Sequence, residues 1–298
     1  MAHVMTVICN PQKPELSGTA IDEFWAALEM ADARPDEVEI LAEGVAADIF
    51  FELNEDETLP AIRKQCRGPF DINIQPVKGR ARRLLIADMD STIIQQECLD
   101  ELAAYAGKRD EISAITARAM RGELDFEGAL RERVAMLKGL SVDALEATLS
   151  EKITLMPGAM ELVATMKARG AVTALVSGGF TFFTARIADL VGFDTNQGNR
   201  LVIEDGKLTG EVEEPILGKE AKLEALNALC AEHNIDADRA MAVGDGANDL
   251  AMLNAAGAGV ALHAKPVVAQ AARYRIDNGD LTALLYLQGI RRDQFAVE

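Results

Sequence analysis

This sequence of 298 residues contains few cysteines, and none of them form a pair that suggests a metal knuckle or a disulfide framework. The four cysteines, Cys9, Cys66, Cys98 and Cys230, are far apart and include no C-x-x-C pair. Such spacing predicts reduced, mostly buried thiols, as in cytosolic proteins. We therefore expect neither a structural disulfide nor a zinc ion bound by cysteines.

Long apolar runs and an excess of basic residues are also missing. No stretch of eighteen apolar residues occurs, and the first residues, Met-Ala-His-Val-Met-Thr, contain no basic region before an apolar run. These absences argue against a transmembrane helix and a signal peptide, so we expect the protein in the cytoplasm. The formal net charge is −18. Because nucleic acids and anionic membranes bind basic surfaces, we expect neither as a partner.

The length and the 49% hydrophobic content predict a folded protein of about two domains. Within residues 1–78, the pattern predicts a strand, a helix, two strands, a helix and a strand: Val4–Cys9, Gly18–Met30, Val38–Leu41, Ala47–Leu53, Glu57–Gln65 and Asp71–Val77. That βαββαβ order is the α+β arrangement called ferredoxin-like. A short basic link, residues 78–83, leads into the second domain, residues 79–298.

The first domain resembles ACT-type domains, which often sense amino acids. Such domains usually carry a glycine in the first turn between strand and helix, whereas this turn is Asn10-Pro11-Gln12-Lys13-Pro14. The sequence therefore favours a structural or dimerising role, with a homodimer formed through this domain, over the binding of a regulator.

Two carboxylates follow a predicted buried strand at the start of the second domain. Asp88-Met89-Asp90-Ser91-Thr92 comes directly after the apolar run Leu84–Ala87. Such a strand is typical of a parallel sheet covered on both faces, and ligands bind beyond the carboxyl ends of its strands. Since residues two apart on a strand point the same way, Asp88 and Asp90 can reach one reacting centre. Taken alone, the same pattern also fits a turn or a helix N-cap.

Three further segments support a phosphate site. Ser177-Gly178-Gly179 follows a second apolar strand, and its hydroxyl and amides can contact phosphate oxygens. Lys219 begins a predicted helix, residues 219–233, and a third strand leads into Gly244-Asp245-Gly246-Ala247-Asn248-Asp249. In the order D-x-D-S-T, S-G-G, K and G-D-G-x-N-D, these segments resemble the four motifs of the haloacid dehalogenase-like phosphatases. The resemblance extends from residue 84 to about residue 290.

The resemblance implies an α/β fold, a doubly wound parallel (Rossmann-like) sheet with a small helical cap inserted at about residues 94–151. Apolar residues at helical spacing in that insertion predict three helices, near 98–106, 111–120 and 126–137. A cap that closes over the strand ends would exclude water from the site. After the cap, residues 199–212 predict a hairpin about Asp205-Gly206.

The resemblance also implies the chemical roles. Asp88 would be the nucleophile that forms an acyl phosphate, and Asp90 would be the general acid and base. Lys219, Ser177 and the amide of Gly178 would compensate the charge of the phosphoryl oxygens.

A magnesium site follows from the same motifs. Mg²⁺ prefers oxygen ligands, and Asp88, Asp245 and the main-chain carbonyl of Asp90 would supply them. Asp249 would support the metal ligands without coordinating the ion directly.

Two runs, 88–97 and 120–134, are similar to phosphoserine phosphatases. In that family a glutamate binds the substrate ammonium and the first arginine of L-R-x-R-V binds its carboxylate, which by motif are Glu97 and Arg131. Phe126 and Met120 would line the apolar side of the cap, and Asn248 would also touch the substrate. Arg133 is interpreted as a structural residue.

The sequence therefore predicts a Mg²⁺-dependent enzyme that hydrolyses the small molecule O-phospho-L-serine to L-serine and phosphate, the last step of serine biosynthesis. One alternative is a phosphatase or phosphotransferase for another small phosphorylated amino acid or alcohol, which would keep the core and change the cap. Another is a non-catalytic amino-acid sensor. The intact Asp88, Asp90, Lys219 and Asp245 argue against the sensor.

Overall fold

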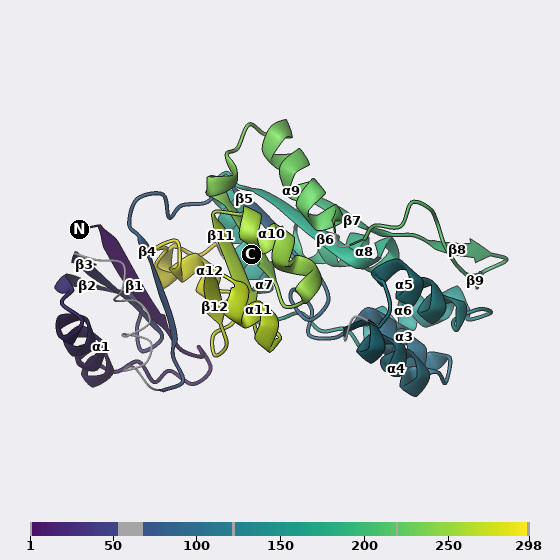
Figure 1. Ribbon diagram of the computed structural model, residues 1–298, viewed down its shortest axis with the longest axis horizontal. Coiled ribbons are helices and arrows are strands. Elements are labelled where there is room, and N and C mark those ends of the chain that lie inside the picture. The colour runs from purple at the N-terminus through teal and green to yellow at the C-terminus, as the bar shows by residue number, and fades with distance from the viewer. Residues whose placement is uncertain (1, 53–67, 121–122, 219, 297–298) are drawn as a thin grey trace.

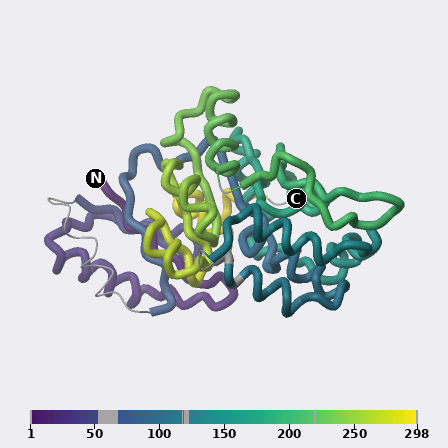
Figure 2. Tube along the Cα trace, turned by 45° about the vertical axis from the view of Figure 1, so that its right-hand side comes forward, coloured from purple at the N-terminus to yellow at the C-terminus, as the bar shows by residue number. Residues whose placement is uncertain are grey.

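The computed structural model describes residues 2–52, 68–120, 123–218 and 220–296. Three parts follow one another along its long axis (Figure 1): the N-terminal sheet with its helix, a central parallel sheet covered by helices, and a group of helices with a protruding hairpin. The tube in Figure 2 shows the same succession from another side. Within the described ranges, no helix is long and apolar enough to cross a membrane.

The central sheet is parallel throughout, with six strands in the order β12-β11-β10-β5-β6-β7. Its central strands are fully buried, as expected for a parallel sheet covered on both faces. The predicted doubly wound sheet is therefore confirmed. In chain order the strands are β5 (Leu84–Ala87), β6 (Val172–Phe180), β7 (Thr195–Asn199), β10 (Ala240–Gly244), β11 (Ala258–Leu262) and β12 (Tyr274–Ile276).

Helices cover both faces because successive strand residues point to opposite sides. Leu85 packs in one apolar core with helices α7, α8 and α12, whereas Leu84 and Ile86 pack in another with α9, α10 and α11. These helices are α7 (Ala159–Ala168), α8 (Thr181–Val191), α9 (Ala221–Glu232), α10 (Leu250–Ala255), α11 (Pro266–Ala271) and α12 (Ala283–Tyr286).

Two strands of the central sheet differ from the prediction. Strand β6 continues through Ser177, Gly178 and Gly179 to Phe180, where a turn was expected after Val176. Strand β7, which was not predicted, forms one edge of the sheet. Its sequence, TNQGN, has no apolar alternation, so its pairing with β6 is a result of tertiary structure.

The N-terminal sheet is antiparallel, in the order β2-β3-β1-β4. This agrees with the predicted ferredoxin-like order, although the second predicted helix, residues 57–65, lies outside the described residues. One face of the sheet packs against α1 (Gly18–Met30), which begins at the N-cap Ser17. The strands are β1 (His3–Ile8), β2 (Arg34–Ala42), β3 (Ala46–Glu52) and β4 (Asp71–Pro76). The domain boundary near residue 78, the ACT resemblance and the homodimer stay predictions.

Polar side chains of β4 attach the other face of this sheet to the core. Residues 71, 73 and 75 alternate with the isoleucines that face α1, so all three point toward the core. The Asn73 amide donates to the Arg275 carbonyl oxygen at 3.0 Å and accepts from the Arg275 amide at 2.9 Å. Gln75 Nε2 donates to the Leu287 carbonyl oxygen at 2.5 Å. The N-terminal sheet therefore rests on main-chain groups of β12 and the chain after α12.

Helices α3 to α6 lie between β5 and α7, and we call this group the cap. The structure shows a fourth helix, α6, which the sequence interpretation left out. It begins at Ser141, whose hydroxyl accepts from the Asp143 amide, and buries Leu145. The four helices are α3 (Cys98–Tyr105), α4 (Arg109–Met120), α5 (Phe126–Ala135) and α6 (Val142–Glu151).

The predicted hairpin is present as β8 (Leu201–Glu204) and β9 (Lys207–Val212). Asp205 and Gly206 both have positive φ angles, 48° and 72°, as a two-residue hairpin turn requires. Main-chain hydrogen bonds join the hairpin to the cap, from Gly139 N to Leu208 O at 2.8 Å and from Leu208 N to Leu140 O at 2.9 Å. The hairpin is therefore an extension of the cap.

Candidate active site

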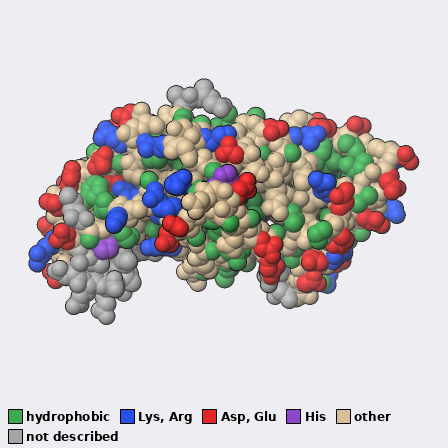
Figure 3. Space-filling view, turned by 90° about the horizontal axis from the view of Figure 1, so that it is seen from above, with side chains coloured by type: hydrophobic (Ala, Val, Ile, Leu, Met, Phe, Trp, Pro, Cys, Tyr) green, Lys and Arg blue, Asp and Glu red, His purple; other side chains and the backbone are tan. Residues whose placement is uncertain are grey.

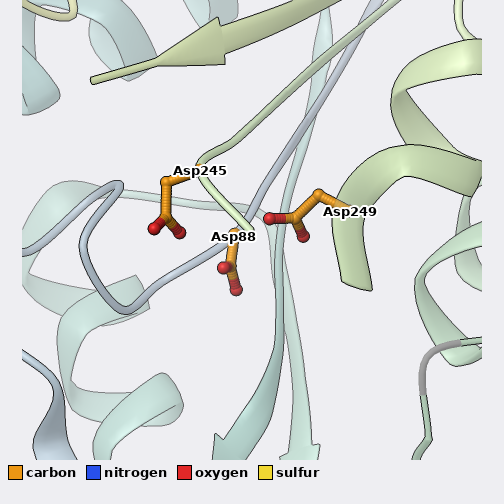
Figure 4. A group of neighbouring side chains, drawn as sticks. All are labelled: Asp88, Asp245 and Asp249. Atoms are coloured by element: carbon orange, nitrogen blue, oxygen red, sulfur yellow. The ribbon is translucent and has the colours of Figure 1, made fainter. Parts of the chain in front are cut away.

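Three aspartates meet beyond the carboxyl ends of the central strands. Asp88 follows β5, Asp245 follows the neighbouring strand β10, and Asp249 closes the short turn before α10. Their carboxylates lie close together (Figure 4), and one oxygen of each lies within 4.8 Å of the others. All three side chains are buried. Buried carboxylates this close repel one another unless cations compensate them.

Among the residues that the structure describes, Lys222 is the buried cation that contacts this cluster. Its Nζ lies 2.6 Å from Asp88 Oδ1 and 2.5 Å from Asp249 Oδ1. Burial alone lowers the pKa of a lysine, but Asp249 and Asp88 outweigh burial and raise the pKa of Lys222, so the group stays charged.

The sequence interpretation gave this role to Lys219, which lies outside the described residues. Lys222, three residues further along the chain, contacts these aspartates in the described structure. It lies on the buried face of α9, four residues before the buried Leu226. A lysine at apolar spacing on a helix was the signal that could have identified it.

Asp90 lies beside the cluster and is held by two hydrogen bonds. Its Oδ1 accepts from the Cys98 amide at 2.9 Å, and its Oδ2 accepts from Ser177 Oγ at 3.4 Å. Burial, and next the negative charge of Glu97, raise the pKa of Asp90 to about 7. A carboxyl with such a pKa is suited to both giving and taking a proton near neutral pH.

Ser177, Gly178 and Gly179 lie next to Asp90, at the end of β6. Ser177 Oγ accepts from the Gly179 amide at 2.9 Å, and the Asn199 amide donates to the Gly178 carbonyl oxygen at 2.8 Å. Phe126 of the cap packs against Gly178, because a Cβ at residue 178 would come within 2.8 Å of Phe126 Cζ. Glycine at this position therefore lets the cap approach the core.

A cavity of about 450 Å³ lies between the core and the cap. Its core side includes Asp88, Asp90, Ser177, Gly178 and Asp245, and also Asn248. Its cap side includes Glu97, Thr116, Phe126 and Arg133. The predicted residues Glu97, Phe126 and Asn248 are thus brought to one space, whereas the side chain of Met120 lies outside the described part of the chain.

Arg131 and Arg133, both in α5, exchange the places that the sequence interpretation gave them. Arg131 does not line the cavity; it is exposed and pairs with Glu127 at 3.1 Å and Glu214 at 2.7 Å. Arg133 lines the cavity, with its Nη1 3.3 Å from Thr116 Oγ1. Burial lowers the pKa of Arg133, but the guanidinium group of an arginine is not deprotonated in proteins.

The charge balance of the cluster fits a divalent cation. Three buried carboxyl groups, Asp88, Asp245 and Asp249, and the half-buried Asp90 lie near two cations. These are the buried Lys222 and the half-exposed Lys265, whose Nζ lies 3.5 Å from Asp245 Oδ2. Burial raises the pKa of Asp245 to about 6. Because a hard cation favours ionised carboxylate oxygens, a divalent metal at this cluster would relieve the repulsion.

Comparisons with known proteins agree with this geometry. A family model described as haloacid dehalogenase-like hydrolase matches residues 85–254. The chain belongs to that family. A solved structure, a phospho-aspartyl intermediate analogue of phosphoserine phosphatase, is 40% identical, with a TM-score of 0.65, and covers 69% of this chain and 98% of its own. This hydrolase therefore groups with the phosphoserine phosphatases.

Two further relatives are similar to this chain over different shares of its length. The hydrolase t0658 from Salmonella enterica, a member of the same family, is 33% identical, with a TM-score of 0.82. The similarity covers 96% of this chain, and so extends into its N-terminal sheet, and 98% of that hydrolase. A phosphoserine phosphatase from Streptomyces coelicolor is 46% identical over 215 residues, 72% of this chain. The match spans only 52% of the length of that relative.

Proposed function

We propose that this hydrolase uses Mg²⁺ to convert O-phospho-L-serine to L-serine and phosphate, as the final step of serine biosynthesis. One observation carries the proposal: a single cavity joins a phosphoryl-transfer site to a carboxylate and a guanidinium of the cap. Phosphoserine has the matching groups, a phosphate at one end and an ammonium and a carboxylate at the other. The phosphoserine phosphatases among the relatives support the same substrate.

In the first step Asp88 attacks phosphorus. Its Oδ1 accepts from the Met89 amide at 2.8 Å and contacts Lys222, so we assign the attack to Oδ2. The new bond joins that oxygen to phosphorus, and the bond from phosphorus to the serine oxygen breaks. Asp90, whose pKa of about 7 keeps a proton available, gives it to the leaving oxygen. The products are serine and an aspartyl phosphate.

In the second step water attacks the phosphorus of the aspartyl phosphate. Asp90, now a carboxylate, takes a proton from that water, and the bond between phosphorus and Asp88 breaks. Phosphate leaves and both aspartates return to their starting states. Asp90 can serve both steps because its pKa of about 7 lies near neutral pH.

Charge compensation comes from residues already in place. Lys222 and Ser177 lie beside Asp88 and Asp90, where the phosphoryl oxygens would be. Asp88, Asp245 and the main-chain carbonyl of Asp90 would hold Mg²⁺, which supplies positive charge to the phosphoryl group. Asp249 accepts from Lys222 and from the Gly246 amide, so we assign it to supporting the ligands.

The cap would select the amino-acid end of the substrate. Glu97, held at 2.9 Å by the Ser91 hydroxyl, would bind the ammonium group. Arg133, held by Thr116, would bind the carboxylate in the place first predicted for Arg131.

Phosphate release should be measured with phosphoserine, phosphothreonine, phosphoethanolamine and p-nitrophenyl phosphate. We expect the highest kcat/KM for phosphoserine, and no turnover by Asp88→Asn despite an unchanged circular dichroism spectrum. Trapping of the intermediate followed by peptide mass analysis should label Asp88. A label on another residue, or a preference for a substrate without a carboxylate, would contradict the proposal.

A further inference from the structure

A buried aspartate of the N-terminal sheet accepts hydrogen bonds from a loop of the catalytic core. Asp71, the first residue of β4, is 3% exposed. Its Oδ1 accepts from the amides of Asp277 at 2.8 Å and Asn278 at 3.1 Å, and its Oδ2 accepts from the Gly279 amide at 2.7 Å. The Asn278 side chain donates to the same carboxylate at 3.0 Å. Asp71 therefore determines the path of the chain directly after β12.

The same loop is hydrogen-bonded to His263, the residue that follows β11. The Gly279 carbonyl oxygen lies 2.8 Å from His263 Nε2, so the ring donates from that nitrogen. The His263 amide donates to the Ile276 carbonyl oxygen, also at 2.8 Å. His263 has a φ of 43°, in the left-handed region. Because that conformation is unfavourable for residues other than glycine, these bonds are needed to keep the chain in it.

Two residues after His263 the chain reaches the metal cluster. The Lys265 amide donates to the Asp245 carbonyl oxygen at 3.1 Å, and Lys265 Nζ lies 3.5 Å from Asp245 Oδ2. Lys265 also lines the cavity between core and cap. Hydrogen bonds from Asp71 through Gly279 to His263, the chain segment from His263 to Lys265, and the contacts of Lys265 thus connect Asp71 to Asp245.

We propose that Asp71 is a positioning residue for the metal site: by holding residues 277–279, it keeps His263 and Lys265 where they orient Asp245. The inference rests on the proposed role of Asp245 as a Mg²⁺ ligand. It gives the N-terminal sheet a function in the reaction that does not need a bound regulator. Loss of the Asp71 carboxylate would leave buried amides without an acceptor, and the loop would shift to regain partners.

Calorimetric titration of Mg²⁺ into the full-length protein tests this role. Asp71→Asn should raise the dissociation constant for Mg²⁺ by about tenfold, the lower end of the effect known for residues that orient metal ligands. His263→Asn should weaken Mg²⁺ similarly, because asparagine tolerates the left-handed conformation but cannot reach Gly279 as the ring does. In both variants, kcat at saturating Mg²⁺ should stay near that of the unmodified protein.

Asn73→Ala is the matched control. Asn73 lies two residues away on the same face of β4 and bonds to Arg275, but it does not contact residues 277–279. It should lower stability and leave Mg²⁺ affinity unchanged. Equal weakening by Asn73→Ala, or unchanged affinity in both Asp71→Asn and His263→Asn, would overturn the positioning role. Asp245→Ala separates the two proposals: if it binds Mg²⁺ normally, the metal site itself is wrong.

Discussion

The ammonium group of Lys222 lies between Asp88 and Asp249 at hydrogen-bonding distance from both. At the scale of single residues, this contact is the main compensation of a buried acidic cluster. Its loss would leave two buried carboxylates without their cation, and the phosphoryl group without a partner for its negative charge. A flexible surface lysine could not replace it, because the position inside the core is what makes the interaction strong.

We therefore expect Lys222→Met to lower kcat by about 100-fold or more, the usual cost of removing one group that stabilises transition-state charge. Phosphate release from phosphoserine at saturating Mg²⁺ measures the effect. Lys219→Met is the matched control, three residues away in the sequence, and should retain most activity. If Lys219→Met lost activity and Lys222→Met kept it, the assignment would be reversed.

Arg133 and Arg131 offer a second pair of matched variants. Arg133→Ala should cost roughly 2 to 5 kcal/mol of transition-state binding for phosphoserine, because the substrate carboxylate would lose its partner in a largely closed site. The kcat/KM for phosphoethanolamine, which has no carboxylate, should hardly change. Arg131→Ala removes only exposed ion pairs and should affect neither substrate. Equal losses on both substrates for Arg133→Ala would make it a structural residue.

At the scale of elements, the hairpin and the cap share a contact that two glycines can test. Gly210 of β9 has a φ of 86°, and a Cβ there would lie 3.0 Å from Lys138 Cβ and 3.3 Å from the Ala135 main chain. Gly206, at the hairpin turn, has a φ of 72° with open space around it. Alanine would strain the backbone at both positions, but only at residue 210 would it also press against the cap.

Gly210→Ala should therefore reduce the free energy of unfolding by about 1 to 3 kcal/mol more than Gly206→Ala does. It should also raise KM for phosphoserine, since displacement of α5 moves Arg133. Urea denaturation and steady-state kinetics measure the two effects. If both variants lost the same stability and kept the same KM, the hairpin would not support the position of the cap.

At the scale of the whole molecule, Arg80 joins the N-terminal sheet to the core. Its Nη2 lies 2.8 Å from Oδ2 of the fully buried Asp48, and its Nε donates to the Leu287 carbonyl oxygen at 3.1 Å. On the face shown in Figure 3, by contrast, basic side chains are interspersed with acidic ones and form no continuous positive surface. Because exposed ion pairs contribute little to stability, we expect the buried pair of Arg80 and Asp48 to join the N-terminal sheet to the core more effectively than surface charges do.

Arg80→Ala should lower the free energy of unfolding by about 3 to 5 kcal/mol, because it leaves the charge of Asp48 buried and unpaired. The double variant Asp48→Asn/Arg80→Met should regain most of that loss, since it removes both charges and keeps much of the volume. Chemical denaturation of the full chain measures both. A loss of less than about 1 kcal/mol in Arg80→Ala would show that the link is not needed for stability.

Local sequence patterns were sufficient to predict much of the fold of this protein. Apolar runs that end in Asp88 and in Asp245 predicted the central strands and the edge of the sheet where the acidic groups meet, because burial on both faces requires such runs. The turn at Asp205-Gly206 was predictable for a similar reason, since few residues tolerate its φ angles.

Choices between similar residues depended on tertiary structure. Lys219 and Lys222 are three residues apart in the sequence, and Arg131 and Arg133 both lie in α5, about 200° apart around its axis. Local propensity is nearly the same for each pair, so it did not indicate which side chain lies in the site. The packing of α9 on the sheet and of α5 within the cap decided that Lys222 and Arg133 lie in the site. Burying a cation is favourable only where carboxylates already lie.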